Sequence, residues 1–324
     1  MSTATVDIAQ DEAAAAISAG GDIAARSPFQ LFWRRLRTDK VALVAAIVIV
    51  LLVLVAIFAP LIVKAVGAPD PNVQDPAALD DFGLPAGPSS EHIFGVDQIG
   101  RDVFARTIYG ARISLTVALI ATALIVAIGT VAGMVAGFYR GWTDSVLSRI
   151  MDVQLAFPVL LLALGLGAAC SLGGGCLGGL IQPGLNVVIF VIVLAQWPYF
   201  ARIIRGQVLS LREKEFIEAA RSLGASNSRI IFREILPNLL APIIVYTTLI
   251  IPTNILFEAA LSFLGVGVQP PTATWGAMIA EATNIFDIAW WFMLAPGIAL
   301  VLTVLAFNLV GDGLQDALNP KGDR

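Results

Sequence analysis

Long stretches without a charged residue are the feature of this sequence that most constrains its fold. Residues 41–63 form an almost unbroken aliphatic run. Further uncharged stretches cover residues 113–139, 153–201, 235–257 and 288–311. A helix needs about 20 apolar residues to cross about 30 Å of hydrocarbon. Each stretch therefore suffices for one crossing, and the stretch 153–201 is long enough for two.

Glycine divides that longest stretch into two spans. Residues 171–186 contain most of its glycines together with Pro183, which is typical of a turn. Irregular backbone cannot face lipid, so the prediction is an all-α integral membrane protein with six transmembrane helices. The predicted spans cover residues 41–63, 113–138, 148–170, 186–205, 236–258 and 289–311. The composition agrees, because 57% of the residues are hydrophobic and only 14% are charged, against about 25% charged in soluble domains.

The distribution of Lys and Arg predicts the orientation of the chain. Five basic residues lie just before the first span, and seven lie between the fourth and fifth spans, whereas the third-to-fourth and fifth-to-sixth connections have none. The positive-inside rule then places both termini in the cytoplasm. We expect a disordered tail (1–25), a basic cytoplasmic segment (26–40), an extracytoplasmic loop (64–112), a core of five spans (113–311) and a cytoplasmic tail (312–324).

Both cysteines, Cys170 and Cys176, fall in the third-to-fourth connection, on the predicted outer side. A disulfide across this short loop is feasible in an oxidising compartment. Two free thiols are the alternative, and the sequence does not favour either.

The sequence lacks the residues that several kinds of chemistry require. The single histidine, His92, is expected to be a solvated loop residue, and no Cys/His cluster has metal-ligand spacing. No lysine follows a glycine, so a phosphate-binding loop is absent and nucleotide hydrolysis would have to come from another chain. Asp152 and Glu258 lie near the ends of predicted spans, where we expect interfacial positions. An ion-coupled carrier usually needs a carboxylate nearer the midplane.

The cytoplasmic segment between the fourth and fifth spans carries the strongest local signal. Residues 216–223 can form a short helix, and Gly224 suits the left-handed position that ends one. Ser226 or Asn227 can cap a second helix that runs to Leu236. An amphipathic surface helix at lipid headgroups is the alternative interpretation.

Within this segment, Glu218-Ala219-Ala220 is followed by Gly224 and later by Ile235-Leu236-Pro237. This pattern resembles the EAA loop of ATP-binding-cassette importer permeases. Three further segments resemble the "C"-type subunit of the peptide and nickel branch of that family: Phe94–Leu115, Glu258–Ile279 and Ala306–Lys321. The sequence departs from the pattern at Glu234, where many members of this branch carry histidine.

The resemblance implies a type I importer permease in the cytoplasmic membrane, without catalytic residues, bound metal or cofactor of its own. It implies a heterodimer with a related permease, two ATPase subunits that bind ATP and Mg²⁺, and an outer substrate-binding protein; lipid is the other partner, and nucleic acid is not expected. Coupling to the ATPases is expected within residues 206–236 and the adjoining Pro237. The residues concerned are Phe216, Glu218, Ala219, Ala220, Leu223, Gly224, Ile235, Leu236 and Pro237.

The resemblance implies di- or oligopeptide cargo. Nickel, glutathione or another small polar solute remains an alternative, as do a secondary ion-coupled carrier, a membrane-embedded enzyme and a scaffold.

Two outer segments are candidates for structural or gating roles. Asp97, Arg101 and Asp102 are expected either to pair with one another or to lie in a solvated loop. Gly265, Gly267, Pro270 and Pro271 predict an irregular outer cap, because such helix breakers are not tolerated in a lipid-exposed helix. Trp275, Trp290 and Trp291 are interpreted as interfacial anchors, and Pro198 and Pro296 as kinks in the fourth and sixth spans.

Overall fold

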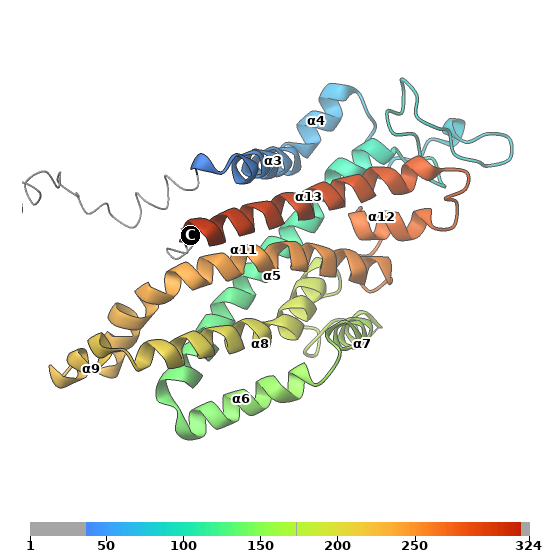
Figure 1. The fold of residues 1–324 in the computed structure, drawn as a ribbon. Coiled ribbons are helices and arrows are strands. Elements are labelled where there is room, and N and C mark those ends of the chain that lie inside the picture. The colour runs from blue at the N-terminus through green and yellow to red at the C-terminus, as the bar shows by residue number, and fades with distance from the viewer. Residues whose placement is uncertain (1–36, 173, 319–324) are drawn as a thin grey trace, which may run out of the picture.

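The computed structural model describes residues 37–172 and 174–318, and these residues form a bundle of long helices (Figure 1). The predicted tail 1–25 and most of the basic segment 26–40 lie outside the described residues. Within the described part there is no strand, only isolated β-bridges. The all-α prediction is confirmed.

Within residues 37–172 and 174–318, five helical stretches are long and apolar enough to cross a membrane. They are α3 (Lys40–Ile57), α5 (Val103–Tyr139), α8 (Leu185–Arg212), the run Asn227–Phe263 and α13 (Trp290–Leu318). The run Asn227–Phe263 joins α10 (Asn227–Arg229), the π-helical η2 (Ile230–Ile235) and α11 (Leu236–Phe263). A sixth span requires the bent pair of α6 (Gly141–Leu155) and α7 (Val159–Leu172).

The third span is therefore not the straight helix 148–170 that the sequence predicts. The axes of α6 and α7 differ by 85°, and the break falls at Ala156–Pro158. Proline has no N–H for the helix ladder and disfavours helical backbone in the residue before it. Pro158 thus gives a physical reason for the break, one that the uncharged composition conceals.

Several other helix boundaries differ from the prediction. Helix α5 begins at Val103, inside the predicted loop 64–112, and α13 continues to Leu318, inside the predicted tail 312–324. The first span ends at Ile57 and is followed by the short helix α4 (Ala59–Val66), with Pro60 in its first turn. The cause is general: uncharged residues mark the crossing, whereas a helix continues into water wherever capping and packing support it.

Helices α5 and α8 form the most extensive helix pair. Gly129, Gly133 and Gly137 lie four residues apart on α5 and face α8. A Cβ atom at Gly133 would lie 2.5 Å from the carbonyl oxygen of Ala201. Small residues with this spacing allow helix backbones to approach closely in a membrane.

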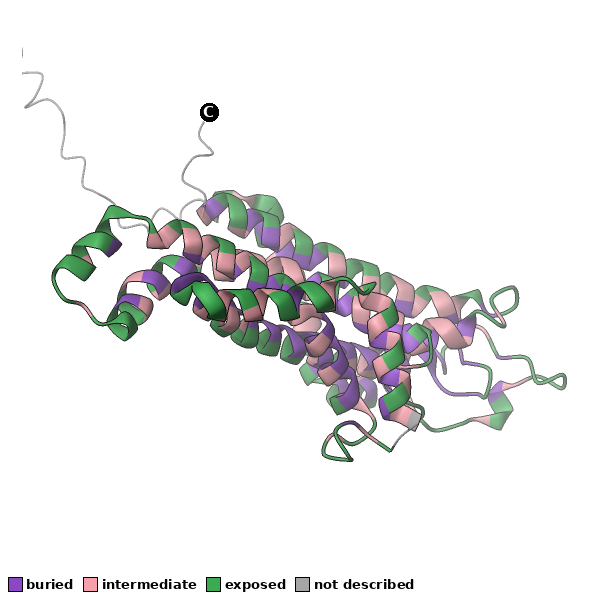
Figure 2. Ribbon diagram, turned by 90° about the horizontal axis from the view of Figure 1, so that it is seen from below, coloured by how far each residue is buried: buried purple, intermediate pink, exposed green. Residues whose placement is uncertain are grey.

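The two ends of the described chain lie at the same end of the bundle. A Cβ atom at Gly313 of α13 would lie 2.4 Å from Cβ of Ala42 in α3. The short helix α9 (Glu215–Ser222) extends from this end, whereas α12 (Trp275–Ala282), η1 (Pro76–Ala78) and the loop around it lie at the opposite end (Figure 1). Much of the bundle surface is exposed between the two ends (Figure 2).

The connection between α7 and α8 is a short loop at the end of the bundle where α12 lies, which we call the outer end after the side that the sequence predicts for it. Cys170 and Cys176 form a disulfide bond in it, and Cys176 pairs with Ile181 in an isolated β-bridge. The glycines of this loop adopt left-handed backbone at several positions, as at Gly175. The glycine-rich segment is thus the turn that its composition predicts.

Candidate functional site: the cytoplasmic bracket and the outer cap

We call residues 215–237 the cytoplasmic bracket, after the side of the membrane that the sequence predicts for them, and they have the local structure that the sequence predicts. Helix α9 ends before Gly224, whose φ of +77° is left-handed. The amide of Ala225 donates to the carbonyl of Ala220 at 3.0 Å and closes the turn. The Ser226 hydroxyl accepts from the amide of Arg229, so Ser226 rather than Asn227 is the cap.

Three isoleucines attach the bracket to the bundle. Ile217, Ile230 and Ile235 are almost fully buried and belong to the same apolar core as Val208 of α8. Burial of one such side chain contributes about 1.5–3 kcal/mol. The bracket is therefore a packed element rather than a loose loop.

The opposite face of the bracket is exposed and partly apolar. Leu223 is 88% exposed and Phe216 is 40% exposed. Of the other predicted coupling residues, Glu218, Ala219, Gly224 and Pro237 are exposed, Ala220 and Leu236 are half-buried, and Ile235 is buried. Exposed apolar side chains surrounded by charged ones are typical of a protein-binding surface.

At the outer end, buried charges join the start of α5 to α12. Arg101 donates to Oδ2 of Asp97 at 2.6 Å and to Oε2 of Glu281 at 2.7 Å. Arg106 lies 3.5 Å from Asp97 and 3.4 Å from Glu281. Asp97 is completely buried and Arg106 is 1% exposed. The solvated-loop alternative is therefore wrong for this cluster, and Arg106 and Glu281 are members that the sequence did not indicate.

His92 is not the solvated loop residue that the sequence predicts. It is 7% exposed, and its Nδ1 lies 2.8 Å from Oδ2 of Asp102. The other carboxylate oxygen of Asp102 accepts from the amide of Ala105 at 2.7 Å and caps α5. The loop folds back over the start of α5, which buries His92 between this cap and Asp75, 3.8 Å away.

The outer cap, residues 264–282, begins with the irregular segment that its glycines and prolines predict. Gly265 has a φ of +79°, and the Pro270–Pro271 peptide bond is cis. A Cβ atom at Gly267 would lie 2.0 Å from the hydroxyl of Ser262, so the chain turns back tightly onto α11. Helix α12, which completes the cap, was not predicted.

The interpretation of Trp275 as an interfacial anchor is wrong. Its side chain is completely buried, and its Nε1 donates to the carbonyl of Thr107 at 3.0 Å. Trp291 is half-buried and donates to the carbonyl of Val96, whereas Trp290 is 51% exposed, as an anchor would be. Trp275 is buried because the cap folds back over the end of the bundle and packs this side chain against α5.

Glu258 does not occupy the interfacial position predicted for it. Its side chain is completely buried, and its Oε1 accepts from the Ser262 hydroxyl at 2.7 Å. Helix α11 continues past it to Phe263, and the outer cap then covers it. Asp152, by contrast, is exposed and pairs with Arg202, as expected near a helix end.

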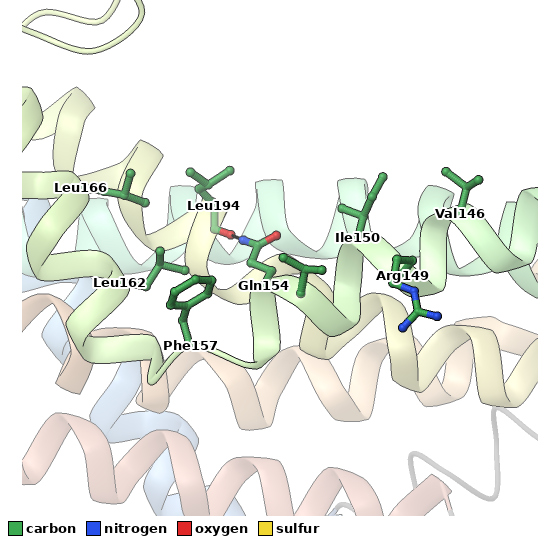
Figure 3. Close-up of a pocket in the computed structure, with 9 residues that line it drawn as sticks. Val146, Arg149, Ile150, Gln154, Phe157, Leu162, Leu166 and Leu194 are labelled. Carbon is green, nitrogen blue, oxygen red and sulfur yellow. Dashed lines mark hydrogen bonds between the residues drawn. The ribbon is translucent and has the colours of Figure 1, made fainter.

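A pocket of about 540 Å³ lies beside the bend between α6 and α7. Its lining is almost entirely apolar, with Arg149 as the one charged residue (Figure 3). Gln154 points across it and donates to the carbonyl of Leu194 on α8. No group of three or more potential metal ligands occurs in the described part of the chain.

The protein is a helical bundle with the cytoplasmic bracket at one end and, at the other, a cap that folds back over the bundle. This arrangement defines a class of protein, the membrane-spanning subunit of an ATP-binding-cassette importer. The fold is shared with solved importers. The membrane subunit of the MetNI methionine ABC transporter, in an inward-facing conformation, matches with a TM-score of 0.56, 19% identity, and coverage of 67% of this chain and 97% of that one. An amino acid ABC transporter matches with a TM-score of 0.51, 16% identity, and coverage of 65% and 94%.

The chain belongs to the family described as binding-protein-dependent transport system inner membrane component, whose model matches residues 129–323. Residues 27–85 match the N-terminal transmembrane domain of oligopeptide transport permease C. It is therefore a multi-pass permease of the inner membrane, and the resemblance inferred from the bracket is confirmed.

Curated relatives cover nearly the whole chain. The dipeptide transport system permease protein DppC of Alkalihalophilus pseudofirmus is 43% identical over 91% of this chain and 90% of its own length. The glutathione transport system permease protein GsiD of Escherichia coli is 46% identical over 91% of each.

Proposed function

We propose that this permease imports di- or oligopeptides as one half of a heterodimeric pathway, driven by ATPase subunits that grip the cytoplasmic bracket. The observation that carries the proposal is the exposed face of the bracket. Leu223, Phe216 and Ala219 form this face, and the opposite face of the bracket packs into the bundle. The peptide class is supported by the dipeptide and glutathione permeases to which the chain is similar.

In this proposal the chain performs no covalent chemistry. ATP and Mg²⁺ are bound by the two ATPase subunits, and an outer binding protein delivers the cargo. Closure of the ATPase pair displaces α9, and the helical run Asn227–Phe263 carries the displacement into the membrane. Nucleotide shifts the equilibrium between inward- and outward-open states only by its differential affinity for them.

The second permease chain covers the apolar pocket at the α6–α7 bend. Ile150, Phe157 and Leu162 line this pocket, and a peptide with charged termini has little to bind among them. A related, equally apolar helix is the better occupant, since packing of small and aliphatic side chains drives helix association in lipid.

Substitution of Ala219 by Trp tests the coupling role. The added ring would stand on the exposed face and hold the ATPase subunit away, so ATP-driven peptide uptake by the reconstituted complex should fall to background. Ala65→Trp, on the exposed face of α4 at the opposite end, is the matched control and should retain uptake. Normal uptake by the Ala219→Trp complex would contradict the proposal.

Cargo and energy source are tested with the same complex. Dipeptides, longer peptides, glutathione and Ni²⁺ are added separately with the binding protein, and a peptide should give the largest stimulation of ATP hydrolysis. Uptake that survives ATP depletion but collapses with an ionophore would identify a secondary carrier instead.

A further inference from the structure

A polar seam runs between α5 and α11 beneath the outer cap. Asn254, Glu258 and Ser262 are spaced four residues apart on α11 and therefore share one helix face. Asn254 donates to the hydroxyl of Thr122 on α5 at 2.7 Å. Two turns nearer the outer end of α5 lies Ser114, which is completely buried.

The carboxyl group of Glu258 sits at the outer end of this seam. The hydroxyls of Ser262, Ser114 and Thr274 surround it, and Thr274 caps α12. None of the basic residues in the described part of the chain pairs with it. An ionised carboxylate without a counter-charge is expensive in the interior of a membrane protein.

Two buried atoms at this point lack a hydrogen bond within the described chain: Oε2 of Glu258 and Oγ of Ser114. A carboxylate only accepts hydrogen bonds, whereas a carboxylic acid also donates one. A proton on Oε2 would let Glu258 donate to Ser114 while Oε1 still accepts from Ser262. The Ser114 hydroxyl could also donate to an ionised Oε2, so the contact allows either form, and it is burial without a counter-charge that favours the protonated acid.

We propose that Glu258, on α11, is a neutral positioning residue that fastens α11 to α5 through Ser114 and to the outer cap through Thr274. The inference rests on the proposed function for its mechanical meaning. Glu258 lies on the helical run Asn227–Phe263 that begins in the bracket, so the fastened cap moves with the helix that the ATPase subunits displace. Without the fastening, bracket movement would reach α11 but would not be passed to the cap.

The variants Glu258→Gln, Glu258→Ala and Ser114→Ala test this inference in the assembled complex. Glutamine is neutral, has nearly the same shape and can donate to Ser114, so uptake should stay within about twofold of wild type. Glu258→Ala removes the contacts to both α5 and the cap, and Ser114→Ala removes the contact to α5. Each should reduce uptake at least about tenfold, the factor expected for one buried hydrogen bond, while ATP hydrolysis continues. Thr303→Val is the matched control, because the buried Thr303 hydroxyl bonds only to Ala299 of its own helix.

Amide hydrogen exchange of residues 264–282 supplies a readout that does not depend on transport. Exchange there should rise in Glu258→Ala, which loses the contact to Thr274, and remain as in wild type in Glu258→Gln and Thr303→Val. Loss of uptake in Glu258→Gln with normal cap exchange would overturn the inference, because the charge of the carboxylate would then be needed. Unchanged cap exchange in Glu258→Ala would also overturn it. If the variants show the expected pattern of cap exchange but the wild-type complex shows no ATP-driven uptake, the proposed function is refuted and the fastening stands.

Discussion

Close packing of α5 against α8 makes Gly133 a sensitive position. A Cβ atom there would lie 2.5 Å from the carbonyl oxygen of Ala201 and 2.8 Å from Cβ of Ile204. Neither atom is the end of a flexible side chain, so the two helices must separate by several tenths of an ångström. Overpacking of this kind costs about 1–3 kcal/mol.

Gly206 offers the matched control on α8. It is exposed, and a Cβ atom there would have no neighbour within 4 Å. Glycine costs a helix interior about 0.8–1.0 kcal/mol relative to alanine, so Gly206→Ala should stabilise the protein by up to about that amount. The same gain offsets part of the overpacking in Gly133→Ala, which leaves a net loss of up to about 2 kcal/mol.

Thermal unfolding of the purified complex, followed by tryptophan fluorescence, measures the difference. Gly133→Ala should lower the midpoint and Gly206→Ala should leave it unchanged or raise it, with the two separated by at least about 2 °C. Equal stabilisation by both substitutions would refute the close approach of α5 and α8 at Gly133.

Two further substitutions test the outer end. Asp97→Asn leaves Arg101 and Arg106 short of a buried counter-charge, so stability should fall by about 3–5 kcal/mol; a thermal midpoint equal to that of wild type would contradict the burial of the cluster. Cys170→Ser opens the disulfide to Cys176, which closes a loop with a sequence separation of 6, and should cost about 2 kcal/mol. Thiol labelling should detect one free cysteine in this variant and none in wild type before reduction.

The bracket could be predicted from sequence because its signals are local. Gly224 ends one helix and Ser226 begins the next, and each acts on backbone within a few residues. The outer cluster was predictable only in part. Asp97 and Arg101 are four residues apart, whereas Glu281 is separated from Arg101 by 180 residues, and only the folded cap brings them together.

Glu258 and Trp275 were misplaced for a related reason. Their positions near the ends of apolar stretches favour a membrane interface, which would be correct if the chain simply left the membrane there. Instead the segment after α11 turns back, and α12 packs over the outer end of the bundle. Hydropathy measures the solvent that a residue prefers, and it contains no information about a distant segment that excludes the solvent.

The length of the run Asn227–Phe263 explains why the polar seam matters to coupling. At 1.5 Å per residue its 37 residues extend about 55 Å. A tilt of about 10° around its centre would move each end by about 5 Å. Pro242 and Pro252 lie inside α11, and each removes a backbone hydrogen bond and weakens the helix against bending. A bend at either proline would absorb the tilt before it reached the cap. The seam from Asn254 to Ser262 begins just beyond Pro252, and it holds the outer part of α11 to α5. Movement of the bracket can therefore reach the outer end only as a shared movement of these two helices.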